Sequence, residues 1–307
     1  MNLDLIIFIK CSGPNVRQDN LTDTIVSFAK KNLNCNYKFY IIAEPSMEGF
    51  VRKIFTDFSC LKEDDLLQLK ISTRSWAKDF NEFFDKCKNL TQWILISHDD
   101  VEYITENYFN KIKEEVKGKE ESIGWITSTS DYYYTQENKL VQDTMRAGFY
   151  KDYDRWGAMF QLNKMHSLPD LSLLDMPKKA VKVHGIMSAV MLVRSKTLEK
   201  IGKCEDWTNY TMIIDEDWSL EALKNNLWNV WIPSVHHKHP LRRSLRPTNN
   251  KWEEEAHSGF LKKWGFKTGN YNQGISIPVE ELRKKYKNTN IPWSTYRNSY
   301  DWEYINE

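Results

Sequence analysis

The sequence predicts an α/β protein with a mainly parallel sheet flanked by helices and a C-terminal helical or irregular extension. In the first half, short apolar runs alternate with segments whose apolar residues recur at helical spacing, such as Ile25, Phe28 and Ala29. Strands that alternate with helices imply crossover connections, and these connections produce parallel pairing. The 307 residues contain no internal repeat or low-complexity linker, so one compact domain with an appendage is expected.

The first half divides into four strand and helix pairs. Ser75 stands where the N-cap of the third helix is expected, directly before an amphipathic segment. The strands are predicted at residues 3–9, 37–45, 66–72 and 92–97, and the helices at residues 19–33, 46–58, 75–88 and near 104–116.

The second half is less regular. Residues 123 to about 177 show no clear period and are rich in Tyr, Asp and Met. Gly202 is expected to end a helix as its C-cap. The elements predicted beyond this stretch are a strand at 182–193, a helix at 195–202, a helix from about Asp217, a strand at 228–235 and a helix at 252–266.

Composition excludes several classes of protein. The formal net charge is +1, which argues against a nucleic-acid partner, because such proteins usually carry a strongly basic surface. The five cysteines are odd in number and form no CxxC pair, so a reducing, cytoplasmic location is expected. The apolar run Leu5–Ile9 is too short to span a bilayer, and only peripheral membrane contact stays open.

Three ionisable residues follow an apolar run in "WILISHDDVEY", where His98, Asp99 and Asp100 come after a predicted strand. Buried charge is costly unless it is paired or bound to a cation. Adjacent carboxylates at a strand end suit Mn²⁺ or Mg²⁺, and ligands of parallel sheets bind beyond that end. The alternative is an ordinary solvated loop.

A second acidic cluster is "IIDEDWSLEA", in which Asp215, Glu216 and Asp217 begin a predicted helix. Acidic residues are routine in a first helical turn because they complement the helix dipole. The functional alternative is a general base, since a carboxylate beside other carboxylates can accept a proton from a hydroxyl.

The third cluster is "HHKHPLRR", which holds three histidines within four residues and two arginines. Neutral imidazole binds metals, and Arg242 and Arg243 could clamp phosphate oxygens. A solvated basic loop is the alternative.

In their order and spacing, these signals resemble the GT-A-fold glycosyltransferases, particularly the inverting family 2, over about residues 3 to 245. "SWAKDFNEFF" resembles the family's Gly-x-Ala-x-x-x-Asn helix, with Ala77 and Asn81 in place but Ser75 for the glycine. "ILISHDDV" resembles its DxD strand end. The other matching segments are "HGIMSAVMLVRSKTLEKIG", "YTMIIDEDWSLEALKNNLWNVWIPSVHHKH" and the Lys-Trp-Gly ending of "HSGFLKKWG".

The resemblance implies roles residue by residue. Asp217 falls on the general base, with Glu216 as its partner. The metal ligands, for Mn²⁺ or Mg²⁺, fall on Asp100, His98, His239 and His237. His98 stands at the first DxD position, which is a departure from the family. The residues implied for nucleotide-sugar binding are Ser12, Glu44, Trp76, Lys78, Asn81, Asp99, Arg242 and Arg243, and those for acceptor binding are Gly185, Ile186 and Trp218.

The function expected from the resemblance is inverting transfer of a sugar from a nucleotide-sugar donor to a hydroxyl of a glycan or lipid-linked acceptor. Residues 1–245 would form the transferase domain, with a nucleotide-sugar half at 1–125 and an acceptor half at 126–245, and 246–307 the extension. Two alternatives stay open: a sugar-1-phosphate nucleotidyltransferase and a non-catalytic carbohydrate-binding protein that keeps the fold. Trp76, Trp156, Trp207 and Trp218 are candidates to stack on a sugar, with core packing as the alternative for each.

Overall fold

The structure of the chain is a computed structural model. The residues that the structure describes are 3–11, 18–73, 75–136, 139–144, 178–183, 185–186, 189–207, 214–239, 251–264 and 304–305. Ser12, Trp156, Arg242 and Arg243 lie outside these residues, and so does most of the irregular stretch that ends near residue 177.

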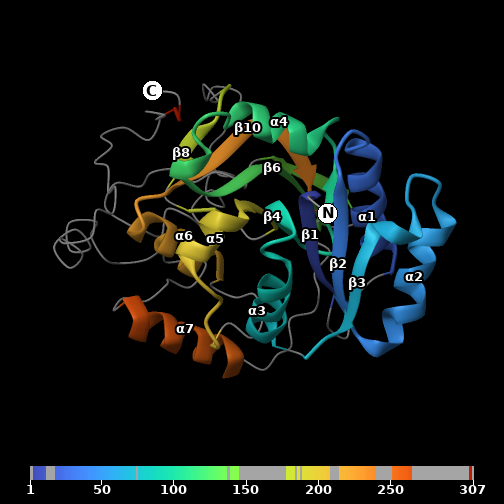
Figure 1. Cartoon of the computed structure of the whole chain (residues 1–307), viewed down its shortest axis with the longest axis horizontal. Helices are drawn as coiled ribbons and strands as arrows, with labels where there is room; N and C mark the ends of the chain where they lie inside the picture. Colours follow the sequence, from blue (N-terminus) through green and yellow to red (C-terminus); the bar gives the residue numbers. More distant parts are fainter. Residues whose placement is uncertain are drawn as a thin grey trace.

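The described strands form one ten-stranded sheet, in the order β3-β2-β1-β4-β9-β6-β10-β5, with β7 paired to β6 and β8 to β10 (Figure 1). The strands are β1 Leu3–Cys11, β2 Tyr37–Ala43, β3 Leu66–Ile71, β4 Thr91–Ser97, β5 Glu102–Tyr103, β6 Ile123–Gln136, β7 Lys139–Thr144, β8 Val181–Val183, β9 Val190–Arg194 and β10 Trp228–Lys238.

Most of these strands run in one direction. β1 pairs in parallel with β2 and β4, β2 with β3, and β6 with β10. β9 lies antiparallel between β4 and β6, so β6 and β10 run the same way as β1. The predicted α/β class with a mainly parallel, helix-flanked sheet is therefore confirmed. The carboxyl ends of β1, β2 and β4 meet at one edge, where ligands of such sheets bind.

Helices cover both faces of the sheet, because the strands bury side chains on both sides. The helices α1, α2 and α4 pack against the face that carries Leu5, Ile7 and Ile9. The helices α3, α5, α6 and α7 pack against the face that carries Ile6 and Phe8. The helices are α1 Gln18–Lys31, α2 Glu48–Asp57, α3 Trp76–Cys87, α4 Tyr108–Glu115, α5 Ser195–Ile201, α6 Ile214–Lys224 and α7 Lys251–Trp264, with short 3₁₀ turns at Pro45–Met47, Glu63–Asp65 and Glu120–Ser122.

Two sequence predictions need correction. The stretch from residue 123, expected to be irregular, begins with the long strand β6, whose first residues Ile123, Trp125 and Ile126 are buried. The single strand expected at 182–193 is two strands in different places, because β8 pairs with β10 whereas β9 pairs with β4. Both errors concern pairing between distant segments, which local periodicity does not specify.

Both predicted helix caps are present. The Ser75 side chain accepts a hydrogen bond from the Lys78 amide at 3.3 Å and so begins α3. Gly202 ends α5 with φ of 98°, a left-handed conformation that favours glycine.

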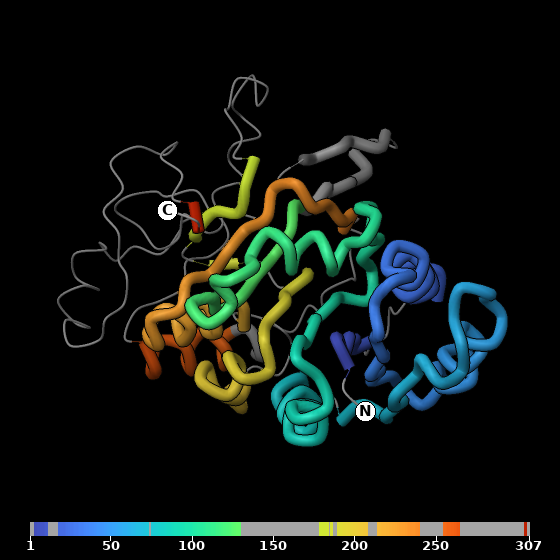
Figure 2. Tube along the Cα trace, turned by 45° about the horizontal axis from the view of Figure 1, so that its top comes forward, coloured from blue at the N-terminus to red at the C-terminus, as the bar shows by residue number. Residues whose placement is uncertain are grey.

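The described parts of the C-terminal extension pack on the same domain. Ala256, Phe260 and Trp264 of α7 belong to the core between the sheet and α6. The segment at Tyr304 bridges to Val181 of β8, and the two lie side by side in Figure 2. Among the described helices, none is long and apolar enough to cross a membrane.

Candidate functional site

The His98–Asp99–Asp100 turn is fixed on several sides after β4 ends. The His98 amide donates to the Ala189 carbonyl at 3.0 Å, and the Val101 amide donates to Thr24 Oγ1 of α1 at 2.9 Å. Ser97 Oγ donates to the His98 carbonyl at 2.9 Å. A backbone held at this many points presents its side chains in one arrangement.

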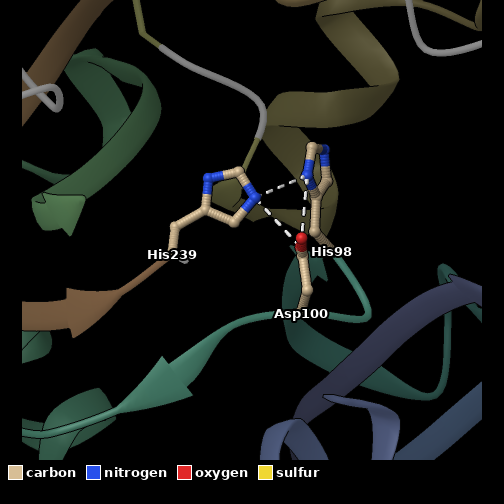
Figure 3. Close-up of side chains that lie close together, drawn as sticks. All are labelled: His98, Asp100 and His239. Carbon is tan, nitrogen blue, oxygen red and sulfur yellow. Dashed lines mark hydrogen bonds and ion pairs between the residues drawn. The ribbon is translucent and has the colours of Figure 1, made fainter. Parts of the chain in front are cut away.

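Strand pairing brings His239 to this turn. β10 pairs antiparallel with β5, so that His237 lies opposite Tyr103 and Lys238 opposite Glu102. His239, the residue directly after β10, therefore lies beside the turn that ends at Val101. Its Nε2 lies 3.0 Å from Asp100 Oδ1 and 3.4 Å from His98 Nδ1 (Figure 3).

These three residues form a candidate metal cluster, because their ligand atoms all lie within 4.8 Å of one another and could hold one ion. His98 Nδ1 and Asp100 Oδ1 are 4.0 Å apart. Two ligand atoms bound at right angles about 2.1 Å from an ion lie about 3 Å apart, and opposite ones about 4.2 Å. The separations of 3.0 and 3.4 Å match neighbouring ligands, and that of 4.0 Å approaches the distance between opposite ligands, so the three atoms could surround one ion and leave other positions open for a substrate.

The electrostatics of the cluster favour a cation. Burial lowers the pKa of His98 to about 4, with a contribution from His239, so this imidazole is neutral at physiological pH and can donate a lone pair. Burial alone would raise the pKa of Asp100, but attraction and a hydrogen bond from His239 outweigh it and lower that pKa. Asp99 differs, because burial and the neighbouring Asp100 raise its pKa to about 7.

The fourth predicted ligand, His237, is not part of the cluster. Its side chain is buried, and its Nδ1 shares a hydrogen bond of 2.7 Å with Ser128 Oγ of β6. Ser128 in turn contacts the Tyr108 hydroxyl of α4. His237 lies within β10 and is 1% exposed, whereas His239 follows the end of the strand, where it reaches the turn.

Several predicted nucleotide-sugar residues lie near the carboxyl edge of the parallel strands. Glu44 follows β2 directly and is half-buried. Trp76 is buried and packs edge-on against Phe8, and its Nε1 has no hydrogen-bond partner among the described residues. Lys78 is exposed on α3. The Asn81 amide instead joins α3 to the segment after α5, accepting from the Cys204 amide at 2.8 Å and donating to its carbonyl at 2.9 Å.

Sequence reasoning missed an ion pair at the same edge. Lys10 Nζ, near the end of β1, lies 2.9 Å from Asp79 Oδ2 of α3, and the two side chains are 6% and 0% exposed. Asp79 also accepts hydrogen bonds from Ser72 and Thr73, which follow β3. The lysine near the end of an apolar strand was the one available signal, since its partner is far away in the sequence.

The acidic cluster of α6 is more buried than a solvated first turn would be. Asp215, Glu216 and Asp217 are 9%, 6% and 1% exposed, and the helix begins three residues earlier than expected, at Ile214. Burial, reinforced by Asp215, raises the pKa of Glu216 well above its ordinary value. Asp217 contacts two residues of α7, Lys263 and Trp264.

The predicted acceptor residues lie around α6. The Ile186 amide donates to Ser219 Oγ of α6 at 3.2 Å, which places the neighbouring Gly185 beside the same helix. Trp218 is 1% exposed. Its ring stacks on Trp125 at 4.8 Å and packs against Phe80 at the same distance, so its surface is used in core packing.

Comparisons with known proteins support the fold. No family model matches the chain, and no curated protein matches it in sequence. Among solved structures, the chain is similar to GalNAc-T7, crystallised with UDP, GalNAc and Mn²⁺, with a TM-score of 0.59 and 10% identity. The match covers 95% of this chain and 55% of that one, so this chain spans about half the neighbour's length. The fold is therefore GT-A-like.

Proposed function

We propose that this protein is a glycosyltransferase that moves a sugar from a nucleoside diphosphate sugar to a hydroxyl group with the help of a divalent cation. The observation that carries the proposal is the cluster of His98, Asp100 and His239. It lies after β4 at the carboxyl edge of a GT-A-like sheet, the edge at which sheets of this class bind ligands.

Of the two cations expected from the sequence, the donor set favours Mn²⁺. Two imidazoles and one carboxylate suit Mn²⁺ better than Mg²⁺, which prefers oxygen ligands alone. When bound, such an ion would offset the negative charge that develops on the diphosphate leaving group. His98 in place of the usual carboxylate thus fits a change in metal preference.

The donor would lie across the ends of β1, β2 and β4. We propose that Glu44 and Asp99 face the nucleotide sugar and that Lys78 and Trp76 line its site. Asn81, which makes two hydrogen bonds with the Cys204 backbone, would act by holding α3 in place. The same proposal keeps three residues outside the described ones, Ser12, Arg242 and Arg243, as contacts to the nucleotide and its phosphates.

For the acceptor half, we propose that the first turn of α6 supplies the general base. Asp217 has this role and Glu216 is its partner. The acceptor oxygen would lose its proton to the Asp217 carboxylate and attack the anomeric carbon from the face opposite the diphosphate, which inverts the configuration. Gly185 and Ile186 would line the acceptor side, and Trp218 would support it from the core. A glycan or lipid-linked saccharide is the proposed acceptor.

The two alternatives from the sequence are not favoured. Residues 9–18, "IKCSGPNVRQ", contain one glycine and lack the Gly-rich phosphate loop of nucleotidyltransferases. The sequence signal for a non-catalytic carbohydrate-binding protein was the departure at His98, but His98 lies within ligand distance of Asp100 and His239, which argues against a degenerate metal site.

Nucleotide binding with and without metal tests the proposal. The midpoint of thermal unfolding should rise with one of UDP, GDP, dTDP or CMP when Mn²⁺ is present, because a ligand that binds only the folded state stabilises it. Asp100→Asn should remove the metal-dependent part of this rise. Asp57→Asn, which removes an exposed carboxylate on α2, is the matched control and should leave it intact. Folded protein that responds to none of the four nucleotides contradicts the proposal.

A further inference from the structure

The C-terminal helix α7 contacts the proposed base directly. Trp264 Nε1 donates a hydrogen bond of 2.7 Å to Asp217 Oδ1. Lys263 Nζ lies 2.9 Å from the same oxygen and 3.0 Å from Oδ2. Two neighbouring residues of α7 therefore fix the orientation of a carboxylate that is 1% exposed.

Lys263 lies among three carboxylates. Its ammonium also lies 2.9 Å from Glu205 Oε1, after α5, and 3.0 Å from Glu221 Oε1, one turn along α6. Burial would lower the pKa of Lys263, but Asp217 and the other carboxylates outweigh this effect and raise it. The side chain therefore stays charged over the whole physiological pH range.

The docking of α7 does not depend on these polar contacts alone. Ala256 and Phe260 of α7 are buried in the core, and the Phe260 ring packs edge-on against Trp207 at 6.4 Å. Gly259 lies so close to the Trp207 ring that an added Cβ would come within 2.3 Å of it. Apolar packing already holds the helix, so the charged contact at its end has another consequence: it orients Asp217.

We propose that Lys263 and Trp264 are positioning residues for proton transfer, so that α7 completes the acceptor half of the site. This inference rests on the proposed function, with Asp217 as the base. A carboxylate oxygen can accept two hydrogen bonds. Among the described residues, Oδ1 has contacts from both Trp264 and Lys263, whereas Oδ2 has a contact from Lys263 alone, so Oδ2 is the atom that keeps room for a proton.

The proposed transfer accounts for every bond and proton, with Oδ2 as the proton acceptor. The acceptor O–H proton goes to Asp217 Oδ2, and the acceptor oxygen forms the new bond to the anomeric carbon. The bond between that carbon and the diphosphate oxygen breaks, and its electron pair leaves with the diphosphate.

Hydrogen-bond donors that contact the Asp217 carboxylate also stabilise its charged form. Burial, with a contribution from Glu221, raises the pKa of Asp217, and Lys263 and Trp264 partly offset this rise. The other carboxylates of this region are Asp215 and Glu216 on α6 and Glu205, which contacts Lys263.

The test uses the full chain with Mn²⁺ and a panel of UDP-, GDP- and dTDP-hexoses. Water serves as the acceptor hydroxyl, and release of nucleoside diphosphate is measured between pH 5.5 and 9. Trp264→Phe keeps the ring but removes the N–H donor, and Lys263→Met keeps most of the side-chain length but removes the charge. Both should lower kcat, by about 10-fold and 100-fold respectively, with KM for the donor within about 2-fold, because orientation of a reacting group acts on turnover. Each should also move the acidic limb of the pH profile upward by about one pH unit.

The controls separate positioning from folding. Lys262→Met removes the same charge from an exposed position of the same helix and should leave both kcat and the acidic limb unchanged. Lys263→Arg should restore part of the activity. In an Asp217→Asn background, Lys263→Met should cause no further loss of kcat. Thermal unfolding of every variant shows whether it is folded at the assay temperature.

The outcomes for this inference and for the proposed function differ. A wild-type protein that turns over no donor of the panel contradicts the proposed function. An active wild type whose Trp264→Phe and Lys263→Met variants, both folded, keep its kcat and acidic limb overturns the positioning role alone. Losses confined to thermal stability would likewise make α7 a purely structural element.

Discussion

The placement of α6 against the sheet leads to a quantitative prediction about Gly124. This residue of β6 has no side chain, and a Cβ added there would lie 2.5 Å from Ala222 Cβ of α6 and 3.2 Å from Asn229 Oδ1. The Ala222 atom is attached directly to the helix backbone and cannot rotate away. Gly124→Ala should therefore push α6 off the sheet, with an overpacking cost of about 1 to 3 kcal/mol.

The assay is equilibrium unfolding in urea, together with the midpoint of thermal unfolding, which falls by about 1.5 °C per kcal/mol in a protein of this size. Gly49→Ala is the matched control, because an added Cβ there meets nothing within 4 Å and the residue lies in α2. Its free energy of unfolding should rise by about 0.5 to 1 kcal/mol through helix propensity. If Gly124→Ala were as stable as the wild type, the close contact between β6 and α6 would be wrong.

Two further predictions concern α3 and α6. Ser75→Ala should lower the free energy of unfolding by about 1 kcal/mol, because it removes the side chain that caps the Lys78 amide; Ser75→Asp, measured in the same urea titration, should retain most of it, and an equal loss in both would argue against the cap. Burial and Asp215 raise the pKa of Glu216 above its ordinary value of 4.5, so the folded state holds this proton more tightly than the unfolded state. The stability that this proton contributes is fully present below pH 4.5 and is lost as pH rises through the folded-state pKa. Glu216→Gln should therefore gain stability relative to the wild type at pH 8 but not at pH 4, and a difference that is independent of pH would refute the shift.

The sequence determined the local elements. Apolar alternation and helical spacing located β1, β2, β3 and β4 and the helices between them, because these patterns depend on neighbours along the chain. The N-cap at Ser75 and the C-cap at Gly202 followed from backbone chemistry that also acts within a few residues. The position of His98 and Asp100 after a buried strand was readable for the same reason.

Tertiary structure alone decided which distant residues meet. Pairing of β10 with β5 sets His239 against Asp100 and leaves His237 bonded to Ser128, a choice of register that a one-residue slip would reverse. The pairing of Lys10 with Asp79, and of Asp217 with Lys263 and Trp264, joins residues far apart in sequence. Such contacts depend on how helices pack across a sheet, so they cannot be predicted from the periodicity and spacing of residues along the sequence.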